Sequence, residues 1–283
     1  MEDQIVYFNG NFIPKSKVVI SPDDRGFLFS DGVYEVIRSY NGKLFLFDKH
    51  IERLKYSLKE IRIDFDAFNY LKEISFKLLE MNNLIDADAV IYIQMTRGVF
   101  KRMHQFPTEK IPPTVYITAN YTRYYPDEIE KGIKVITVKD LRWERCDIKT
   151  TALLANILAQ QEARDANAIE AIFVKNGLVT EGSHTGVFGV KDDKVLTHPQ
   201  NNKVLPSITR ELVLQLAQIC QIPVKEVPIY ENQLYSLDEF FVVGTSTEIT
   251  PVIQINNCLL NNGIPGKITR LLQAEFKKTI EKL

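Results

Sequence analysis

The sequence predicts a mixed α/β (α+β) protein with a small N-terminal domain and a larger C-terminal domain. Its 283 residues are 45% hydrophobic and 25% charged, which is an ordinary globular composition and a sufficient length for two domains. β-rich runs alternate with amphipathic helical segments along the chain. The tyrosine- and proline-containing stretch 121–126 is typical of a linker. We therefore expect domains at 1–120 and 133–283, joined by a linker over 121–132.

Two hairpins are expected in the small domain, because Asn9-Gly10 and Asn41-Gly42 each separate β-rich runs. The glycines within residues 24–32 indicate a tight bend between these hairpins. Asp48 is expected to cap the first helix. The predicted elements are strands at 5–8, 12–13, 33–40, 43–47, 89–96 and 115–119, and helices at 50–61 and 67–81.

The large domain is expected to continue the alternation of strands and helices. Asn176-Gly177 and Asp192-Asp193 supply turns. Thr150 or Thr151 is expected to cap a helix that runs to about residue 166. The other predicted elements are strands at 133–138, 171–174, 186–190, 224–227 and 240–243, and helices at 208–220 and 268–283.

The bulk properties exclude several classes of protein. The formal net charge of -1 gives no electrostatic reason to expect nucleic acid or an anionic membrane as a partner. No apolar run approaches the length of a membrane span, and the acidic N-terminus lacks the features of a signal peptide. The three cysteines are scattered without metal-ligand spacing. We therefore expect a cytoplasmic protein without a bound metal.

The chain is organised around residues 142–155, where a predicted strand breaks into a polar turn, presents Lys149 and leads into an alanine- and leucine-rich helix. A lysine at such a boundary is usually a surface residue. Glu181, after the Asn176-Gly177 turn, would alone be interpreted as a solvated glutamate. A functional interpretation of Lys149 and Glu181 is favoured because the chain also contains several candidate anion-binding residues.

Positive charge and backbone donors suited to an anion occur at two places. Arg53 follows His50 by one helical turn, so both side chains can share one helix face. A helix opening near Ser207 leaves the N–H groups of Ile208 and Thr209 free to bind an anion. Thr245, after a buried strand, is a further candidate contact. A glycine-rich P-loop is absent, so an NTPase is not expected.

The segment Arg102-Met103-His104 is the most discriminating motif. In an extended segment alternate residues point the same way, so Arg102 and His104 can bind one anion together. Arginine matches a carboxylate in fork geometry. Tyr34 accompanies this pair in the motif Asp31-Gly32-Val33-Tyr34-Glu35. The alternative interpretations are a solvated basic turn for the loop and a core aromatic for Tyr34.

Taken together, these residues resemble those of the fold type IV aminotransferases, which use pyridoxal 5'-phosphate (PLP), and most closely the bacterial D-amino-acid aminotransferases. The likeness extends over nearly the whole chain. It implies a larger C-terminal domain that is barrel-like and a cofactor between the domains. The resemblance assigns Schiff-base formation to Lys149, pairing with the pyridine nitrogen to Glu181, phosphate binding to Arg53, Ile208, Thr209 and Thr245, and a position close behind Arg53 to His50.

The same resemblance implies the reaction. A D-amino acid such as D-alanine would leave its amino group on the cofactor as pyridoxamine phosphate, and a 2-oxo acid such as 2-oxoglutarate would collect it, in a ping-pong exchange. Tyr34, Arg102 and His104 would hold the substrate carboxylate. A homodimer is implied as well, because in the resembled family the loop with the Arg-x-His pair reaches the neighbouring subunit's active site.

Some positions depart from the family's pattern. Ser183-His184-Thr185-Gly186 stands where relatives tend to have serines and an asparagine, and Phe100-Lys101 replaces smaller residues. These departures bear on the side chain of the substrate. The alternatives within the fold are an L-branched-chain aminotransferase and an aminodeoxychorismate lyase, which generally do not carry the Arg-x-His pair. Outside enzymes, the alternative is a noncatalytic PLP-binding protein, which would not need Lys149, Glu181 and the Arg-x-His pair together.

Overall fold

In the computed structural model, which describes residues 3–122 and 126–283, the chain divides into two compact units. The N-terminal unit comprises Met1–Arg123 together with Ile148–Ala152, and the C-terminal unit comprises Tyr124–Asp147 and Leu153–Leu283. The sequence-based division assigned all of 133–283 to one domain. The short segment that contains Lys149 instead packs with the N-terminal unit, because Ile148 is buried in that unit's hydrophobic core.

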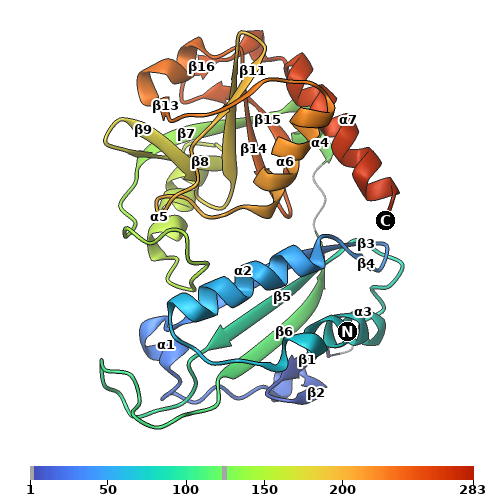
Figure 1. Ribbon diagram of the computed structural model, residues 1–283, viewed down its shortest axis with the longest axis vertical. Coiled ribbons are helices and arrows are strands. Elements are labelled where there is room, and N and C mark those ends of the chain that lie inside the picture. The colour runs from blue at the N-terminus through green and yellow to red at the C-terminus, as the bar shows by residue number, and fades with distance from the viewer. Residues whose placement is uncertain (1–2, 123–125) are drawn as a thin grey trace. The chain divides into compact units, whose positions relative to one another are not determined.

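Within residues 3–122, six strands form one antiparallel sheet in the order β2-β1-β6-β5-β3-β4. Asn9 and Gly10 both have positive φ, as the predicted tight hairpin turn requires. Helix α2 packs on this sheet (Figure 1). The elements are β1 (Ile5–Phe8), β2 (Asn11–Pro14), η1 (Lys15–Lys17), α1 (Arg25–Phe29), β3 (Gly32–Tyr40), β4 (Lys43–Leu44), α2 (Phe47–Glu60), η2 (Ala67–Tyr70), α3 (Leu71–Met81), β5 (Ala89–Thr96) and β6 (Thr114–Tyr121).

The core of this unit follows from the alternation of side chains along its strands. In β5 the residues Ala89, Ile91, Ile93 and Met95 are fully buried. They meet the apolar face of α2 and the buried leucines of α3 in one cluster. Strand β3 presents Val33 and Ile37 to the same cluster. Glu35 lies between them in the strand, so its carboxylate enters the protein interior.

Within residues 126–283, ten strands form one curled sheet in the order β12-β11-β10-β14-β15-β7-β8-β9-β13, with β16 paired to β15 (Figure 1). The elements are α4 (Pro126–Lys131), β7 (Ile133–Lys139), α5 (Leu154–Asp165), β8 (Glu170–Lys175), β9 (Leu178–Gly182), β10 (Gly186–Lys191), β11 (Lys194–Thr197), α6 (Ile208–Ile219), β12 (Val224–Glu226), β13 (Ile229–Tyr230), η3 (Glu231–Ser236), β14 (Glu239–Gly244), β15 (Glu248–Ile255), β16 (Cys258–Leu259), η4 (Asn261–Gly263) and α7 (Lys267–Glu281).

The middle of this sheet is buried on both faces. β7 and β8 are parallel and are connected through α5. Val135 and Ile172 belong to one apolar cluster, whereas Ile136 and Phe173 pack with the alanines of α5 in another. Both strands therefore have near-continuous apolar sequences. The polar turns at their ends can carry functional residues without disturbing this core.

Three predicted features of the small domain are wrong in detail. Within residues 24–32, Arg25–Phe29 form the short helix α1, whose first turn is capped by the Asp24 carboxylate. The expected strand at 43–47 stops at Leu44, because Leu46 adopts a left-handed φ of 52° and begins the turn into α2. Leu46 is consequently the N-cap, and Asp48 lies inside the first helical turn, where its charge favours the helix dipole.

Near the domain junction, the break between the two units lies within the expected linker 121–132. The expected linker contains the end of β6 and the helix α4, while its residues 123–125 lie outside the described part of the chain. Thr150 and Thr151 do not cap α5, which begins only at Leu154 without a side-chain cap. Both threonine hydroxyls instead donate to the carbonyl of Gly32, at 3.1 and 3.2 Å. They attach the Lys149 segment to the first residues of β3.

Several strands were not predicted from the sequence, among them β9, which carries Glu181, and the long β15. Pro251 lies inside β15 and has no N–H to donate, which makes a strand difficult to recognise from the sequence there. The strand tolerates this proline because its parallel pairing with β7 begins only at Val252. No helix in the described residues combines the length and apolar character needed to cross a membrane.

Candidate active site

Lys149 is anchored to the N-terminal unit through its backbone. Its N–H donates to the Ser57 hydroxyl of α2 at 3.2 Å, and its carbonyl accepts from the N–H of Tyr34 at 3.0 Å. The Nζ atom lies 4.2 Å from the centroid of the Tyr34 ring. No carboxylate pairs with Lys149 among the described residues. The structure thus holds the base of this side chain and leaves its amino group outside any ion pair.

A buried charge cluster joins β3 to α2 beside this lysine. Glu35 is fully buried and accepts from Nε and Nη2 of Arg53, from Nδ1 of His50 and from the N–H of Val36. Burial alone would raise the pKa of Glu35, but the adjacent Arg53 and His50 hold that pKa far below its usual range. Glu35 is therefore an ionised carboxylate that orients two predicted site residues.

The protonation of His50 follows from this arrangement. Burial lowers the pKa of His50; Glu35 opposes that change, while Arg53 and Lys149 add to it. The imidazole is accordingly neutral at physiological pH, and the ionised Glu35 can only accept a hydrogen bond. The proton of His50 must therefore reside on Nδ1, which leaves Nε2 as an acceptor. His50 thus adds no positive charge beside Lys149.

In the C-terminal unit, Glu181 is buried on β9 and contacts a single guanidinium. Its Oε1 accepts from Nη1 of Arg142, and its Oε2 accepts from the N–H of Leu205 at 3.0 Å. Arg142 also donates Nε and Nη2 to Asp140, at 3.0 and 2.8 Å, and packs against the ring of Phe173. Burial raises the pKa of Glu181, although Arg142 lowers it. Arg142 and the N–H of Leu205 therefore offset only part of the cost of burying the Glu181 carboxylate.

An anion site is available at the start of α6, in the same unit. Ser207 is the N-cap, and its hydroxyl accepts from the N–H of Arg210 at 3.2 Å. Among the hydrogen bonds of the described residues, none uses the N–H of Ile208 or Thr209. This agrees with the geometry expected from the sequence. Thr245 lies in the turn directly after β14.

Arg102 and His104 are exposed on the loop between β5 and β6. Both contact Phe29 of the N-terminal unit: the Cζ of Arg102 lies 5.3 Å from the ring centroid, and the imidazole centroid lies 5.7 Å from it. No hydrogen bond or ring contact within the described chain joins either residue to Tyr34. The structure therefore groups Lys149, Tyr34, His50 and Arg53, whereas the contacts of the Arg-x-His pair in the described residues are with Phe29.

His184, which departs from the family's pattern, belongs to a different cluster. Its Nδ1 lies 2.9 Å from the buried carboxylate of Glu170, and its ring is half exposed. Glu170 also accepts from the hydroxyl of Thr185 at 2.8 Å and from the N–H of Ser183 at 3.1 Å. Glu170 thus fixes the turn that follows Glu181. In the structure, His184 is a member of this turn.

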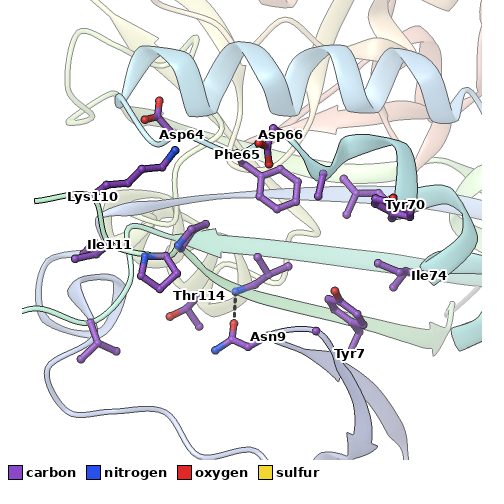
Figure 2. Close-up of a pocket in the computed structure, with 17 residues that line it drawn as sticks. Tyr7, Asn9, Asp64, Phe65, Asp66, Tyr70, Ile74, Lys110, Ile111 and Thr114 are labelled. Atoms are coloured by element: carbon purple, nitrogen blue, oxygen red, sulfur yellow. Dashed lines mark hydrogen bonds between the residues drawn. The ribbon is translucent and has the colours of Figure 1, made fainter.

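A cavity of about 1040 Å³ lies in the N-terminal unit (Figure 2). Its walls include Tyr7, Phe65, Tyr70 and Lys110, and the N–H of Val115 donates to the Asn9 side chain at 2.8 Å. No candidate site residue is among the described residues that line it. The candidate chemistry therefore rests on the side-chain clusters described above rather than on this hollow.

Comparison with known proteins identifies the family. The model of the family described as amino-transferase class IV matches residues 32–255. The chain belongs to the class IV aminotransferases. It is 44% identical to the D-alanine aminotransferase of Staphylococcus aureus (strain MSSA476) over 278 residues, which cover 98% of each chain. These likenesses confirm the predicted family and its fold, that of the fold type IV aminotransferases.

Solved structures of this family have the same fold. The branched-chain amino acid aminotransferase of Escherichia coli superposes with a TM-score of 0.91 at 26% identity, over 98% of this chain and 94% of that one. The branched-chain aminotransferase of the archaeon Thermoproteus uzoniensis, solved with norvaline, gives a TM-score of 0.87 at 28% identity, over 98% and 95%. The likeness in sequence is thus greater to the D-alanine aminotransferase than to these branched-chain enzymes.

Three residues that shape this aminotransferase's candidate site were not predicted as site residues: Glu35, Arg142 and Asp140. A usable signal existed for Glu35, because it stands at a core-facing position of an alternating strand. A charge at such a position requires a buried partner. Arg142 gave a weaker signal, since its partners come from two different strand ends, and only the fold brings them together.

Proposed function

We propose that this class IV aminotransferase transfers the amino group of a D-amino acid, such as D-alanine, to a 2-oxo acid, such as 2-oxoglutarate, with PLP as its cofactor. The observation that carries the proposal is the 44% identity to a D-alanine aminotransferase over 98% of the chain. The presence of Arg102 and His104 in the β5–β6 loop supports it. The structural likeness to branched-chain enzymes supports the shared fold.

The described residues fit such a cofactor. Lys149 offers an amino group that no carboxylate of the described residues pairs with, which suits a Schiff base with an aldehyde. The N–H groups of Ile208 and Thr209, which no described acceptor occupies, suit a phosphate. The buried Glu181 suits a protonated ring nitrogen, because each carboxylate oxygen accepts more than one hydrogen bond. When bound, PLP supplies a ring that accepts the electron pair left on the substrate's Cα.

We assign the chemical roles as follows. Lys149 would hold the cofactor, and its Nζ would take up the proton removed from the substrate's Cα. Ser57 and Tyr34 fix the backbone of Lys149, so only its side chain needs to move. Glu181 would hold a proton on the pyridine nitrogen, and Arg142 fixes the Glu181 carboxylate through Nη1. Arg53, oriented by Glu35, and Thr245 contribute to phosphate binding, and His50 supports Arg53 through Glu35.

We further propose a homodimer in which Arg102 and His104 complete the neighbouring subunit's site together with Tyr34. Support comes from the lack of a contact between this pair and Tyr34 among the described residues of one chain, and from exposed apolar residues on both units. Phe27 is 73% exposed, and Leu154, Ile157 and Leu158 form an exposed stripe on α5. A fully active monomer in sedimentation would contradict this assembly. We also propose a cytoplasmic location, which the free thiols of Cys146, Cys220 and Cys258 support.

The test is a half-reaction with purified protein. D-alanine is expected to convert the absorbance of bound PLP to that of the pyridoxamine form, and 2-oxoglutarate to restore it. Faster conversion by L-leucine than by D-alanine would favour the L-branched-chain alternative, and pyruvate release from aminodeoxychorismate would favour the lyase. Absence of any conversion would favour a noncatalytic PLP-binding protein. Borohydride reduction should fix the cofactor on the peptide containing Lys149, and Lys149→Ala should bind PLP but lose transamination.

A further inference from the structure

The loop that carries Arg102 and His104 is tied at its base to the segment before β3. The N–H of Arg25 donates to the Gly98 carbonyl at 2.9 Å, and the N–H of Phe100 donates to the Asp23 carbonyl at 3.2 Å. These backbone bonds fix the start of the loop. They do not reach the residues that would meet a substrate.

One buried side chain reaches further along the loop. Arg25 is only 3% exposed, and its Nη1 donates to the carbonyl of Met103 at 2.6 Å. Its Nε donates to Asp31 at 2.9 Å, which fixes the guanidinium from the opposite side. Met103 stands between Arg102 and His104, so Arg25 holds the backbone from which both side chains project.

Phe29 provides the second constraint. The Cζ of Arg25 lies 4.9 Å from the centroid of the Phe29 ring, and the guanidinium of Arg102 and the imidazole of His104 contact the same ring. Cation–π contacts of this kind stabilise the orientation of arginine side chains. One aromatic ring therefore orients both members of the Arg-x-His pair.

Asp31 connects this arrangement to the far end of the loop. Besides Arg25, its carboxylate accepts from Nε and Nη2 of Arg97, at 2.7 and 2.9 Å. The Cζ of Arg97 lies 3.7 Å from the ring centroid of Phe106, beyond His104 in the chain. The Asp31 carboxylate thus binds both Arg25 and Arg97, and these two arginines contact the loop before and after the Arg-x-His pair.

We propose that Arg25, seated by Asp31 and Phe29, is a positioning residue for the carboxylate-binding pair Arg102 and His104. This inference rests on the proposed function. Exposed side chains on a loop lose conformational freedom when they bind a ligand, and prior fixation of the loop reduces that cost. Arg25 does not touch the substrate. It presets the direction of Arg102 and His104 through the Met103 carbonyl.

The experiment is a double-mutant cycle on the PLP-loaded enzyme with Arg25→Lys and Arg102→Leu. Lysine keeps a positive charge opposite Asp31, but one ammonium replaces the two nitrogens that serve Asp31 and Met103. We expect R25K to lower kcat/KM for D-alanine by about tenfold, mainly through KM, because one charge-assisted hydrogen bond is lost. The D-alanine to L-alanine preference should fall as well, while the absorbance of bound PLP stays unchanged.

The coupling between the two positions distinguishes positioning from general damage. In the R102L background, R25K should lower kcat/KM by less than about twofold, because the residue to be positioned is already gone. Arg38→Lys is the matched control: Arg38 is also buried and paired with an aspartate, Asp88, at 3.0 Å. R38K should leave both kcat/KM and the D to L preference at wild-type values.

Phe29→Leu provides a second route if R25K does not fold, and it should show the same loss and the same coupling to R102L. Equal effects of R25K or F29L in the wild-type and R102L backgrounds would overturn the positioning role. A wild-type value for R25K would overturn it too, while D-alanine conversion by the unmutated enzyme leaves the proposed function standing. No conversion of D-alanine by the unmutated enzyme would refute both.

Discussion

Each unit of the molecule buries a glutamate against an arginine, and the two pairs have opposite properties. In the N-terminal unit, Glu35 receives Nε and Nη2 of Arg53 together with the imidazole of His50. In the C-terminal unit, Glu181 receives one guanidinium nitrogen, Nη1 of Arg142, and the N–H of Leu205. The pKa of Glu35 is lowered and that of Glu181 is raised, although burial acts to raise both.

The difference lies in how many carboxylates share the N–H donors of each guanidinium. Arg142 gives two of its nitrogens to Asp140, and the pKa of Asp140 is lowered against the effect of burial. Glu181 therefore competes with Asp140 for one cation and also experiences its negative charge. Glu35 instead receives two nitrogens of Arg53. A carboxylate bound in the manner of Glu35 is a fixed anchor, and one bound in the manner of Glu181 can share a proton with a ligand.

This contrast is consistent with the proposed roles. A glutamate that orients Arg53 and His50 should stay ionised under all working conditions. A glutamate that pairs with a pyridine nitrogen should instead hold a proton between itself and that nitrogen, which requires comparable affinities for the proton. The same two residue types therefore provide a structural anchor in one unit and a candidate catalytic partner in the other.

The largest effect is expected from Glu35→Gln. It leaves Arg53 buried opposite a neutral amide, so the free energy of unfolding of the apoprotein at pH 7.5 should fall by about 3–5 kcal/mol. Denaturant unfolding monitored by circular dichroism measures this change. Glu73→Gln, at a surface pair with Lys77, is the control and should cost about 0.5 kcal/mol or less. A loss as small as that of the control would show that Glu35 is not an anchor.

The pH dependence of stability should separate the two glutamates. Glu35 has a lowered pKa in the folded state, so its stabilising contribution is present above its unfolded value of about 4.5 and is lost as the pH falls toward the folded value. Glu181 has a raised pKa, so its contribution is present below about 4.5 and is lost as the pH rises through the folded value. The wild-type advantage over E35Q should therefore grow between pH 3 and 5, and the advantage over E181Q should shrink as the pH rises. Parallel slopes would contradict the contrast.

A smaller free-energy change, but a clear loss of activity, is expected from Glu181→Gln. A neutral amide cannot keep the ring nitrogen protonated, so kcat with D-alanine should fall by about a hundredfold to a thousandfold, the usual cost of removing one preorganised electrostatic contact. Stopped-flow absorbance measures the half-reaction. Glu144→Gln, at an exposed glutamate paired with Lys175 in the same unit, should leave kcat unchanged. Wild-type kcat in E181Q would remove Glu181 from the chemistry.

How far the sequence could predict the fold depended on local signals. The strand at 89–96 and the start of α6 at Ile208 were predicted correctly, because periodicity and the Ser207 cap are local. β15 was missed because its proline is tolerated only through the way β7 pairs beside it. The cap of α5 was wrong because Thr150 and Thr151 bind a strand that is distant in sequence. Local sequence signals therefore fail to predict an element whose boundary is set by tertiary contacts.

The candidate site shows the same limit. Its candidate residues were predicted from motifs and a family resemblance, and the structure shows hydrogen bonds that hold Lys149, Arg53 and Glu181. Neither Arg142 nor Asp140 was expected in the site, since residues that share one guanidinium across strand ends leave no pattern in the sequence. Similarly, the role of Arg25 is invisible in the sequence because its partner is a backbone carbonyl.

The smallest effect is expected from Asp140→Asn, which directly tests the sharing of the Arg142 guanidinium between Asp140 and Glu181. Asparagine is close to aspartate in size and keeps an oxygen that accepts from Arg142, but it removes the competing charge. The pKa of Glu181 should then fall, because Asp140 no longer repels its ionised form and Arg142 is free to neutralise it. Glu181 would become more like Glu35, and its proton would be shared less readily with a ring nitrogen. We expect kcat with D-alanine to fall by about fivefold, the equivalent of roughly 1 kcal/mol for a weakened hydrogen bond. The wild-type decline in stability with rising pH that is due to Glu181 should shift to lower pH in D140N. An unchanged pH profile in D140N would show that Asp140 does not set the properties of Glu181, and the contrast between the two units would then rest on the donors that each glutamate receives.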